Sequence, residues 1–412
     1  MKLNANHTVA ACFTGLMIQA IVINLPPLLY LTFENEFGIS LSKISLLIAI
    51  SFVTQLLMDF TASKFPMLFN NRAMVVIGQL CSMLGLLGMA LLPSIIPPYA
   101  ALIISTTVAA FGGGIIEVMG NPIIEACPVK NKNRILSFMH SCYCWGLVLT
   151  VLLSTLFFKL VGIEHWRILF CLWALIPAVN AIAFMFVPLA PMESAPALTN
   201  KKDSVFRTFT FWAFFMLMLC AGAAEMTMTQ WASSFAEMGL QVDKSTGDLL
   251  GPCTFAVLMG LARVIYAKFS TRLDLSKFMI FSASLCVISY LITAFSPFPI
   301  LSLVGCAVCG FSVGIMWPGT LCMATERIPN GGVKMFALLA LAGDAGCTLG
   351  PTAAGWIAEA FGNNLKISFI FSTVFPALII ALVTVLLVQQ RKNTSLKASR
   401  ILKWNFQNSA SK

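Results

Sequence analysis

The chain has 412 residues, of which 58% are hydrophobic and only 10% are charged. Soluble globular domains have roughly 25% charged residues, so this composition excludes a water-soluble protein. The formal net charge of +10 does not indicate a nucleic-acid or acidic partner, because the basic residues gather in the connections between apolar runs.

Apolar runs of about 20 residues recur along the whole chain, and each is long enough to cross a bilayer. The first run continues past Leu25 without a small-residue cleavage site, so we expect no removed signal peptide. The sequence predicts an all-α integral membrane protein with twelve transmembrane helices, at about 8–32, 43–63, 73–93, 99–121, 134–158, 167–188, 208–234, 247–269, 277–296, 298–322, 336–361 and 367–389.

Lysine and arginine are distributed unequally between the two sides of this predicted bundle. Connections that follow even-numbered spans are rich in them, whereas the opposite side carries Lys43, Lys159, Arg167, Lys244 and Lys366. Cytoplasmic loops carry the excess of basic residues. We therefore expect a multi-pass protein of the cell (inner) membrane with both termini in the cytoplasm.

The chain divides into two similar halves. Its longest polar stretch between spans is 189–207, which follows the sixth span. Lys64-Phe65 and Lys268-Phe269 end the second and eighth spans, and Gly146 and Gly350 match in the fifth and eleventh. Matches separated by about 200 residues indicate a parallel repeat of a six-helix unit. The expected parts are a six-helix bundle at 1–188, a cytoplasmic linker at 189–207, a second bundle at 208–390 and a basic cytoplasmic tail at 391–412.

Six plus six spans, a basic central linker and internal termini resemble the major facilitator superfamily. Two motifs resemble its fucose permease-like sugar symporter branch: Glu117-x-x-x-Asn121-Pro122 and Leu136-x-x-x-His140-x-x-Tyr143-x-x-Gly146. The resemblance implies two pseudo-symmetric bundles, a cavity lined by spans one, four, seven and ten, and proton-coupled sugar symport by alternating access. The first span departs from the branch, because it reads Leu25-Pro26-Pro27 where the branch has an acid.

Few ionisable residues lie inside the apolar spans, and such residues usually face a bundle interior or a water-filled path. The sequence singles out Glu117, together with Glu225 and His140, as candidates for proton coupling. Desolvation penalises an ionised carboxylate, so a carboxyl group in a poorly hydrated cavity can take and release a proton near neutral pH. The alternatives left open are a neutral Glu117 that only bonds a neighbouring helix, and a His140 that only packs.

Amide and aromatic side chains near Glu117 suit a polar solute that can stack on a ring. The residues predicted to line the substrate cavity are Gln19, Asn24, Asn121, Tyr143, Thr229, Gln230, Trp231 and Trp317. Plain packing remains the alternative for the two tryptophans. Asp59, Arg263 and Asp344 are predicted to form a cytoplasmic gate, in which opposite charges hold the two halves together; local pairing within one half is the alternative.

The sequence indicates neither an enzyme nor a cofactor. Cys306-x-x-Cys309 lacks a second pair of ligands, so we expect no metal site, and no activated serine or cysteine stands beside a base. The expected partners are a small-molecule substrate, protons and the lipid bilayer, with the protein a monomer. Within the superfamily, the alternatives are an efflux antiporter for amphipathic or cationic compounds and an uncoupled facilitator.

Overall fold

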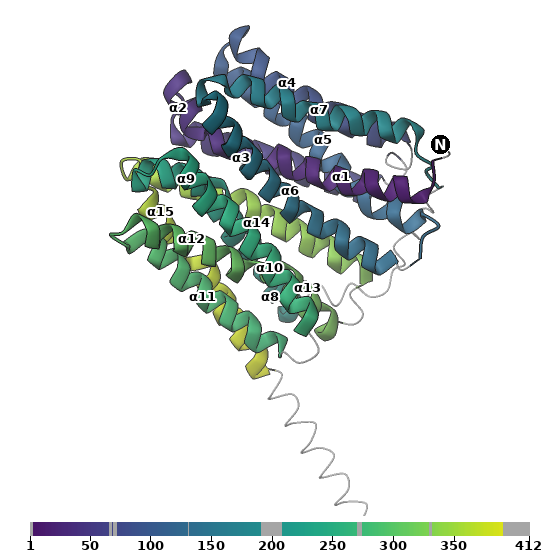
Figure 1. Ribbon diagram of the computed structural model, residues 1–412. Helices are drawn as coiled ribbons and strands as arrows, with labels where there is room; N and C mark the ends of the chain where they lie inside the picture. Colours follow the sequence, from purple (N-terminus) through teal and green to yellow (C-terminus); the bar gives the residue numbers. More distant parts are fainter. Residues whose placement is uncertain are drawn as a thin grey trace, which may run out of the picture.

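The computed structural model describes residues 3–65, 68, 72–130, 132–190, 208–269, 274–328 and 332–389, and in these residues the protein is entirely helical (Figure 1). The predicted linker and tail lie outside the described residues, apart from 189–190. The first half consists of α1 (Ala5–Asn24), η1 (Pro26–Leu29), α2 (Tyr30–Phe37), α3 (Leu41–Lys64), α4 (Arg72–Leu91), η3 (Leu92–Ser94), α5 (Pro98–Ala126), α6 (Lys132–Val161), η4 (Ile163–His165) and α7 (Trp166–Phe186).

The second half repeats this plan with more interrupted helices. It consists of α8 (Phe209–Ser234), the π-turn η6 (Phe235–Gly239), α9 (Lys244–Asp248), the π-turn η7 (Leu249–Cys253), α10 (Thr254–Phe269), α11 (Leu275–Phe295), α12 (Pro299–Val313), α13 (Met316–Arg327), α14 (Gly332–Ala360) and α15 (Leu365–Ser372). After Thr373 the last span continues as helix to Gln389. Eleven helical stretches in the described residues are long and apolar enough to span a bilayer. With the 29-residue α14, they match the twelve predicted spans.

Two spans are broken near prolines. The first span changes from α1 to η1 at Pro26, because proline has no N–H and its ring opposes a continuing α-helix. The tenth span breaks between α12 and α13, where Gly314 and Ile315 form a turn. Pro318 cannot donate the hydrogen bond that the Gly314 carbonyl would normally accept, so this carbonyl is free for another partner.

Small residues bring helices of each half into close contact. A Cβ atom at Gly112 of α5 would overlap the backbone of Ser82 in α4. A Cβ at Gly346 of α14 would overlap the carbonyl of Leu219 in α8. Helices in lipid associate through such close packing because lipid tails are as apolar as the helix surfaces, so the hydrophobic effect does not drive their association. These contacts make each half a rigid bundle.

The two halves meet along a seam in which α3 packs on α14 and α6 on α10. We call the end of the bundle where α1 begins the inner end, following the predicted orientation, and the end that carries α2 the outer end. Figure 1 shows α2, α9 and α15 together at the outer end, whereas the start of α1 and α13 lie apart at the inner end. The halves therefore converge outward and diverge inward.

Candidate functional site

Glu117 lies inside the bundle rather than on its lipid-facing surface. Helix α5 carries Glu117 one turn beyond Gly113. Because Gly113 has no side chain, Gln19 and Gln55 fit beside it. The amide nitrogen of Gln19, on α1, donates a hydrogen bond to Glu117 Oε2. Among the side chains that the structure describes, no cation pairs with this carboxyl group.

Two further acids from the seam surround Glu117. Asp59 of α3 and Asp344 of α14 lie close to each other across the two halves, and both lie within electrostatic reach of Glu117. An ionised carboxylate only accepts hydrogen bonds, so two carboxyl groups can bond to each other only when one holds a proton. The described residues contain no group of three or more His, Cys, Asp or Glu arranged for a metal ion.

This arrangement differs from the separate inner layer that the sequence suggested for Asp59 and Asp344. The expected layer came from counting residues from the inner ends of the helices. Counted from the outer ends, Asp59 lies 18 residues after Leu41 and Glu117 lies 19 after Pro98, about 27 to 29 Å along each helix. Asp344 lies 16 residues before Ala360. The halves are in register at the outer end, so the three acids reach similar depths.

The third predicted gate residue, Arg263, belongs to a second polar group. Its Nη2 lies 3.8 Å from Glu225 Oε1, within the second half. Its Nη1 lies 3.2 Å from Cys144 Sγ, across the seam. Arg263 Nε donates to the Gly314 carbonyl at 3.2 Å, the carbonyl that the break in the tenth span leaves free. The structure thus pairs Arg263 with Glu225, not with an acid of the opposite half.

The remaining predicted cavity residues divide into two sets. Asn24 Nδ2 lies 3.3 Å from the Tyr143 hydroxyl, a contact between α1 and α6 within the first half. Trp317 is partly exposed and contacts Gly343 of α14. Trp231, by contrast, is fully buried, and its indole nitrogen donates to the Pro351 carbonyl at 2.8 Å. In this conformation Trp231 packs the second half together and does not line an open path.

Two residues of α8 beside Trp231 are also buried. Thr229 donates to the Glu225 carbonyl at 2.9 Å, and Gln230 Oε1 accepts from Tyr30 at 2.9 Å. Gln230 therefore joins the halves on the outer side of the acids. His140 lies in α6, but its side chain is outside the described residues.

The stretch of α5 on the inner side of Glu117 is accessible. Asn121 and Glu125 follow Glu117 at intervals of four residues, so the three side chains share one helix face. Glu117 is partly exposed, and Asn121 and Glu125 are exposed. Exposure on this face thus increases from the acid toward the inner end, where the halves diverge.

The outer side of the seam is closed by contacts between the halves. The Ser42 N–H at the start of α3 donates to Glu359 Oε2 of α14 at 2.5 Å. Thr352 donates to the Ser45 carbonyl at 3.4 Å. A separate cavity of about 20 Å³, with room for roughly one water molecule, lies in the first half beside Tyr30, and Gln230 is its one lining residue from the second half. A solute cannot pass the outer side in this conformation.

The Ser42–Glu359 bond caps the first turn of α3 from the other half. Replacing a cap by alanine costs about 1 kcal/mol, or roughly a fivefold change in an equilibrium. We expect Glu359→Ala to shift the protein about fivefold toward an outer-open state. The measurement is the rate at which a membrane-impermeant maleimide, added outside, labels a cysteine introduced at Thr352, which is buried at this seam.

The matched control is Glu36→Ala at the same end. Glu36 bonds Arg167 at 2.6 Å and Trp166 at 2.8 Å, both within the first half. Removing the Glu36 carboxylate should leave the labelling rate unchanged. Equal rates for Glu359→Ala and the parent protein would show that the cap does not hold the outer end closed.

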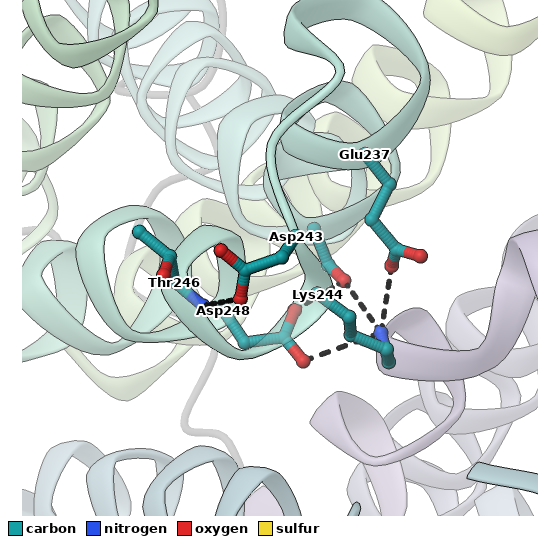
Figure 2. Close-up of polar contacts among 6 residues, drawn as sticks. Glu237, Asp243, Lys244, Thr246 and Asp248 are labelled. Atoms are coloured by element: carbon teal, nitrogen blue, oxygen red, sulfur yellow. Dashed lines mark hydrogen bonds and ion pairs between the residues drawn. The ribbon is translucent and has the colours of Figure 1, made fainter. Parts of the chain in front are cut away.

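A buried ion cluster stabilises the outer ends of α8 and α9. Lys244 Nζ lies 2.7 Å from Glu237 and 3.2 Å from Asp248, which is fully buried (Figure 2). The same ammonium lies 5.5 Å from the ring centroid of Phe158, in the first half. Between the spans, the Thr246 N–H donates to Asp243 at 3.0 Å and lowers the pKa of Asp243, so this cap persists until the carboxylate is protonated in acid.

Removing the cation from this cluster should destabilise the protein. Lys244→Met leaves two acids in a buried site without a counter-ion, which costs about 3 kcal/mol. The expected result is a lower thermal unfolding midpoint in detergent, partly restored by adding Asp248→Asn. Lys277→Met is the control, because Lys277 pairs with Asp274 in the same way but is exposed. Equal midpoints for the two single variants would contradict the expected role.

Sequence reasoning missed the residues that close the outer end. Glu359 and Ser42 are 317 residues apart, and no motif connects them. Lys244 was noted only among the few basic residues on the side opposite the cytoplasm. A usable signal existed in Asp243, since an aspartate followed three residues later by Thr246 is typical of a helix start.

The family model of the Major Facilitator Superfamily matches residues 8–260 and 240–406. The chain belongs to the Major Facilitator Superfamily. It is therefore a secondary transporter of small molecules in a lipid bilayer, and not an enzyme. No curated protein matches this chain in sequence.

Solved structures with the major facilitator fold resemble this one at low sequence identity. A bacterial homologue of the human lysosomal transporter Spinster, solved in an inward-facing and occupied conformation, is 13% identical with a TM-score of 0.73; the match covers 92% of this chain and 96% of that one. A D-xylose-proton symporter is 15% identical with a TM-score of 0.71, covering 90% and 96%. The E. coli fucose:proton symporter is 15% identical with a TM-score of 0.62, covering 92% and 98%. At these identities the similarity shows a shared fold.

Proposed function

We propose that this transporter is a proton-coupled symporter that moves a small polar solute, a sugar or sugar derivative, inward by alternating access. The observation that carries the proposal is the position of Glu117. Its carboxyl group lies at the seam between the halves, bonded to Gln19 and next to Asp59 and Asp344. On its inner side Asn121 and Glu125 of the same helix face are exposed, whereas on the outer side the halves are in contact.

The acid cluster gives a physical reason for coupling. Three ionised carboxylates at one site repel one another and lose hydration, so the converged cluster favours bound protons. Because Asp59 and Asp344 belong to different halves, a proton shared between them also affects how closely the halves approach. A change of protonation can thereby favour one conformation over the other.

The solute would bind between the acid cluster and the Glu225–Arg263 pair. Gln19, Asn24, Tyr143 and Trp317 offer amide, hydroxyl and aromatic groups there, which suit a hydroxylated solute. Asn121 would contact it on the inner side. Thr229, Gln230 and Trp231, buried here, would be reached only when the outer side opens. The fucose and xylose symporters are consistent with this choice of solute.

The test is uptake into proteoliposomes containing the purified wild-type protein. The expected result is accumulation of a labelled sugar or sugar derivative above the outside concentration when the lumen is more alkaline than the bath. Accumulation should stop when a protonophore dissipates the gradient. Equilibration without accumulation would indicate an uncoupled facilitator, the alternative mechanism.

A cation:proton antiporter is the second candidate, because three acids without a described cationic partner also fit a cationic solute. It would extrude a labelled organic cation from the vesicles as protons enter. The direction of net movement under one imposed gradient separates the two functions. For either function we expect both termini on the inner side, which proteolysis of sealed vesicles of known orientation can check.

A further inference from the structure

The guanidinium of Arg263 is held in place without being tightly paired. Its side chain is 28% exposed and lies at the seam, on α10. One firm bond orients it, from Nε to the Gly314 carbonyl at 3.2 Å. This bond fixes the plane of the guanidinium and leaves the edge formed by Nη1 and Nη2 directed toward other partners.

That edge has only weak partners. Nη1 contacts the Cys144 thiol at 3.2 Å, and Nη2 contacts the Met259 thioether at 3.9 Å. Sulfur atoms are weak acceptors. The Glu225 oxygen lies 3.8 Å from Nη2, whereas charge-assisted N–H···O bonds are typically about 2.7–2.9 Å long. The edge that binds carboxylates in a bidentate manner is therefore incompletely satisfied.

A purely structural arginine at this depth would be expected to bond its carboxylate closely, because burying an unbonded charge is expensive. Here the closest atom from the first half is the Cys144 sulfur, which faces the guanidinium across the seam. Tyr143, next to Cys144, also lies within electrostatic reach of Arg263. The guanidinium thus faces the space through which a solute would move between the halves.

We propose that Arg263 binds a carboxylate group of the transported solute, so that the substrate class is hydroxylated organic acids, such as sugar acids, rather than neutral sugars. This inference rests on the proposed transport function and names its solute. Glu225 is the resident partner of Arg263 when no solute is bound. A proton that binds Glu225 removes its charge, and the solute carboxylate takes its place on the Nη1–Nη2 edge.

The exchange keeps the charge of the site constant. One proton and one carboxylate enter together, the proton is held on Glu225 while the solute is bound, and both leave together on the inner side, so the number of charges beside Arg263 is unchanged at each stage. The three acids around Glu117 lie at the other side of the site and would repel a second carboxylate. The solute is therefore expected to place its carboxylate at Arg263 and its hydroxyl groups toward Gln19 and Glu117.

The experiment compares acids with their uncharged amides in proteoliposomes. The probes are labelled D-glucuronate and D-gluconate, each paired with its amide of nearly the same shape, and D-xylose as a neutral sugar. Both exchange without a gradient and accumulation with an alkaline lumen are measured. Wild type should exchange the acids at least tenfold faster than the amides.

The variants separate charge, geometry and folding. Arg263→Gln should reduce exchange of the acids at least tenfold, so that the ratio of acid to amide exchange rates falls toward one. Arg263→Lys, which keeps the charge but not the planar fork, should give an intermediate rate. Arg263→Gln with Glu225→Gln avoids an unpaired buried acid, so it serves as the folded control, checked by its thermal midpoint. It should lose the preference for acids as well.

Two results overturn the inference: no preference for the acids over the amides in wild type, or an unchanged preference in the folded Arg263 variants. The outcomes also separate the two proposals. Preferential exchange of acids without gradient-driven accumulation would reject proton coupling and support the anion site. Gradient-driven accumulation of D-xylose without exchange of either acid would support coupling and reject the anion site.

Discussion

Glu117→Gln is expected to abolish gradient-driven accumulation while leaving exchange of solute across the membrane intact. The amide keeps the size of the side chain and a hydrogen bond with Gln19, but it cannot bind and release a proton. One pH unit corresponds to 1.36 kcal/mol, or a factor of ten. A gradient of 2 pH units can therefore drive about 100-fold accumulation with one proton per solute, and the variant should show none of it.

The measurement is uptake and counterflow of the same labelled solute in matched proteoliposomes. Glu125→Gln is the control, since Glu125 lies on the same face of α5, nearer the inner end, and is exposed. It should accumulate solute as the parent does. Accumulation at the wild-type level by Glu117→Gln would remove this acid from the coupling mechanism.

Gly355→Ala is expected to prevent closure of the outer end. A Cβ atom there would overlap the hydroxyl of Ser45, on α3, and would lie 2.6 Å from the ring of Trp231. Trp231 is fully buried and cannot move aside without disturbing α8. Overpacking of this kind costs about 1–3 kcal/mol, which is roughly fivefold to more than 100-fold in the equilibrium between outer-closed and outer-open states.

Transport should fall about fivefold or more, and external maleimide labelling of a cysteine at Thr352, buried at the seam, should rise. Gly251→Ala is the matched control, because its nearest neighbours would lie 3.7 Å or more from the new Cβ. A protein that transports slowly but labels like the parent would show that the substitution acts elsewhere.

The spans were accessible to sequence analysis because each is a long apolar run, which depends only on local composition. The acids were accessible for the same reason, since Asp59, Glu117 and Asp344 stand out in apolar surroundings. The grouping of these three acids was not accessible to sequence analysis. It depends on which ends of the helices are in register, and that is set by the conformation in which the outer end is closed.

The repeat was informative about position but not about local geometry. Pro122 and Pro318 match between the halves, yet α5 continues through Pro122 while the tenth span breaks before Pro318. The residue four positions earlier is Val118 in the first half and Gly314 in the second. A Cβ atom at Gly314 would lie 2.8 Å from the Met259 carbonyl oxygen of α10, so glycine permits this close approach, and the side chain of Arg263 bonds the freed carbonyl. Such a bond could not be inferred from the sequence.

The cap on α3 has a consequence for biosynthesis. Ser42 and Glu359 are separated by 317 residues, which a ribosome needs roughly 15–60 s to add at about 5–20 residues per second. Throughout that interval the first turn of α3 has been inserted without its partner. The nascent chain therefore passes through a stage in which the first bundle is fully synthesised but the Ser42 N–H lacks its acceptor. Insertion of Glu359, the last acidic side chain of the sequence, supplies that acceptor.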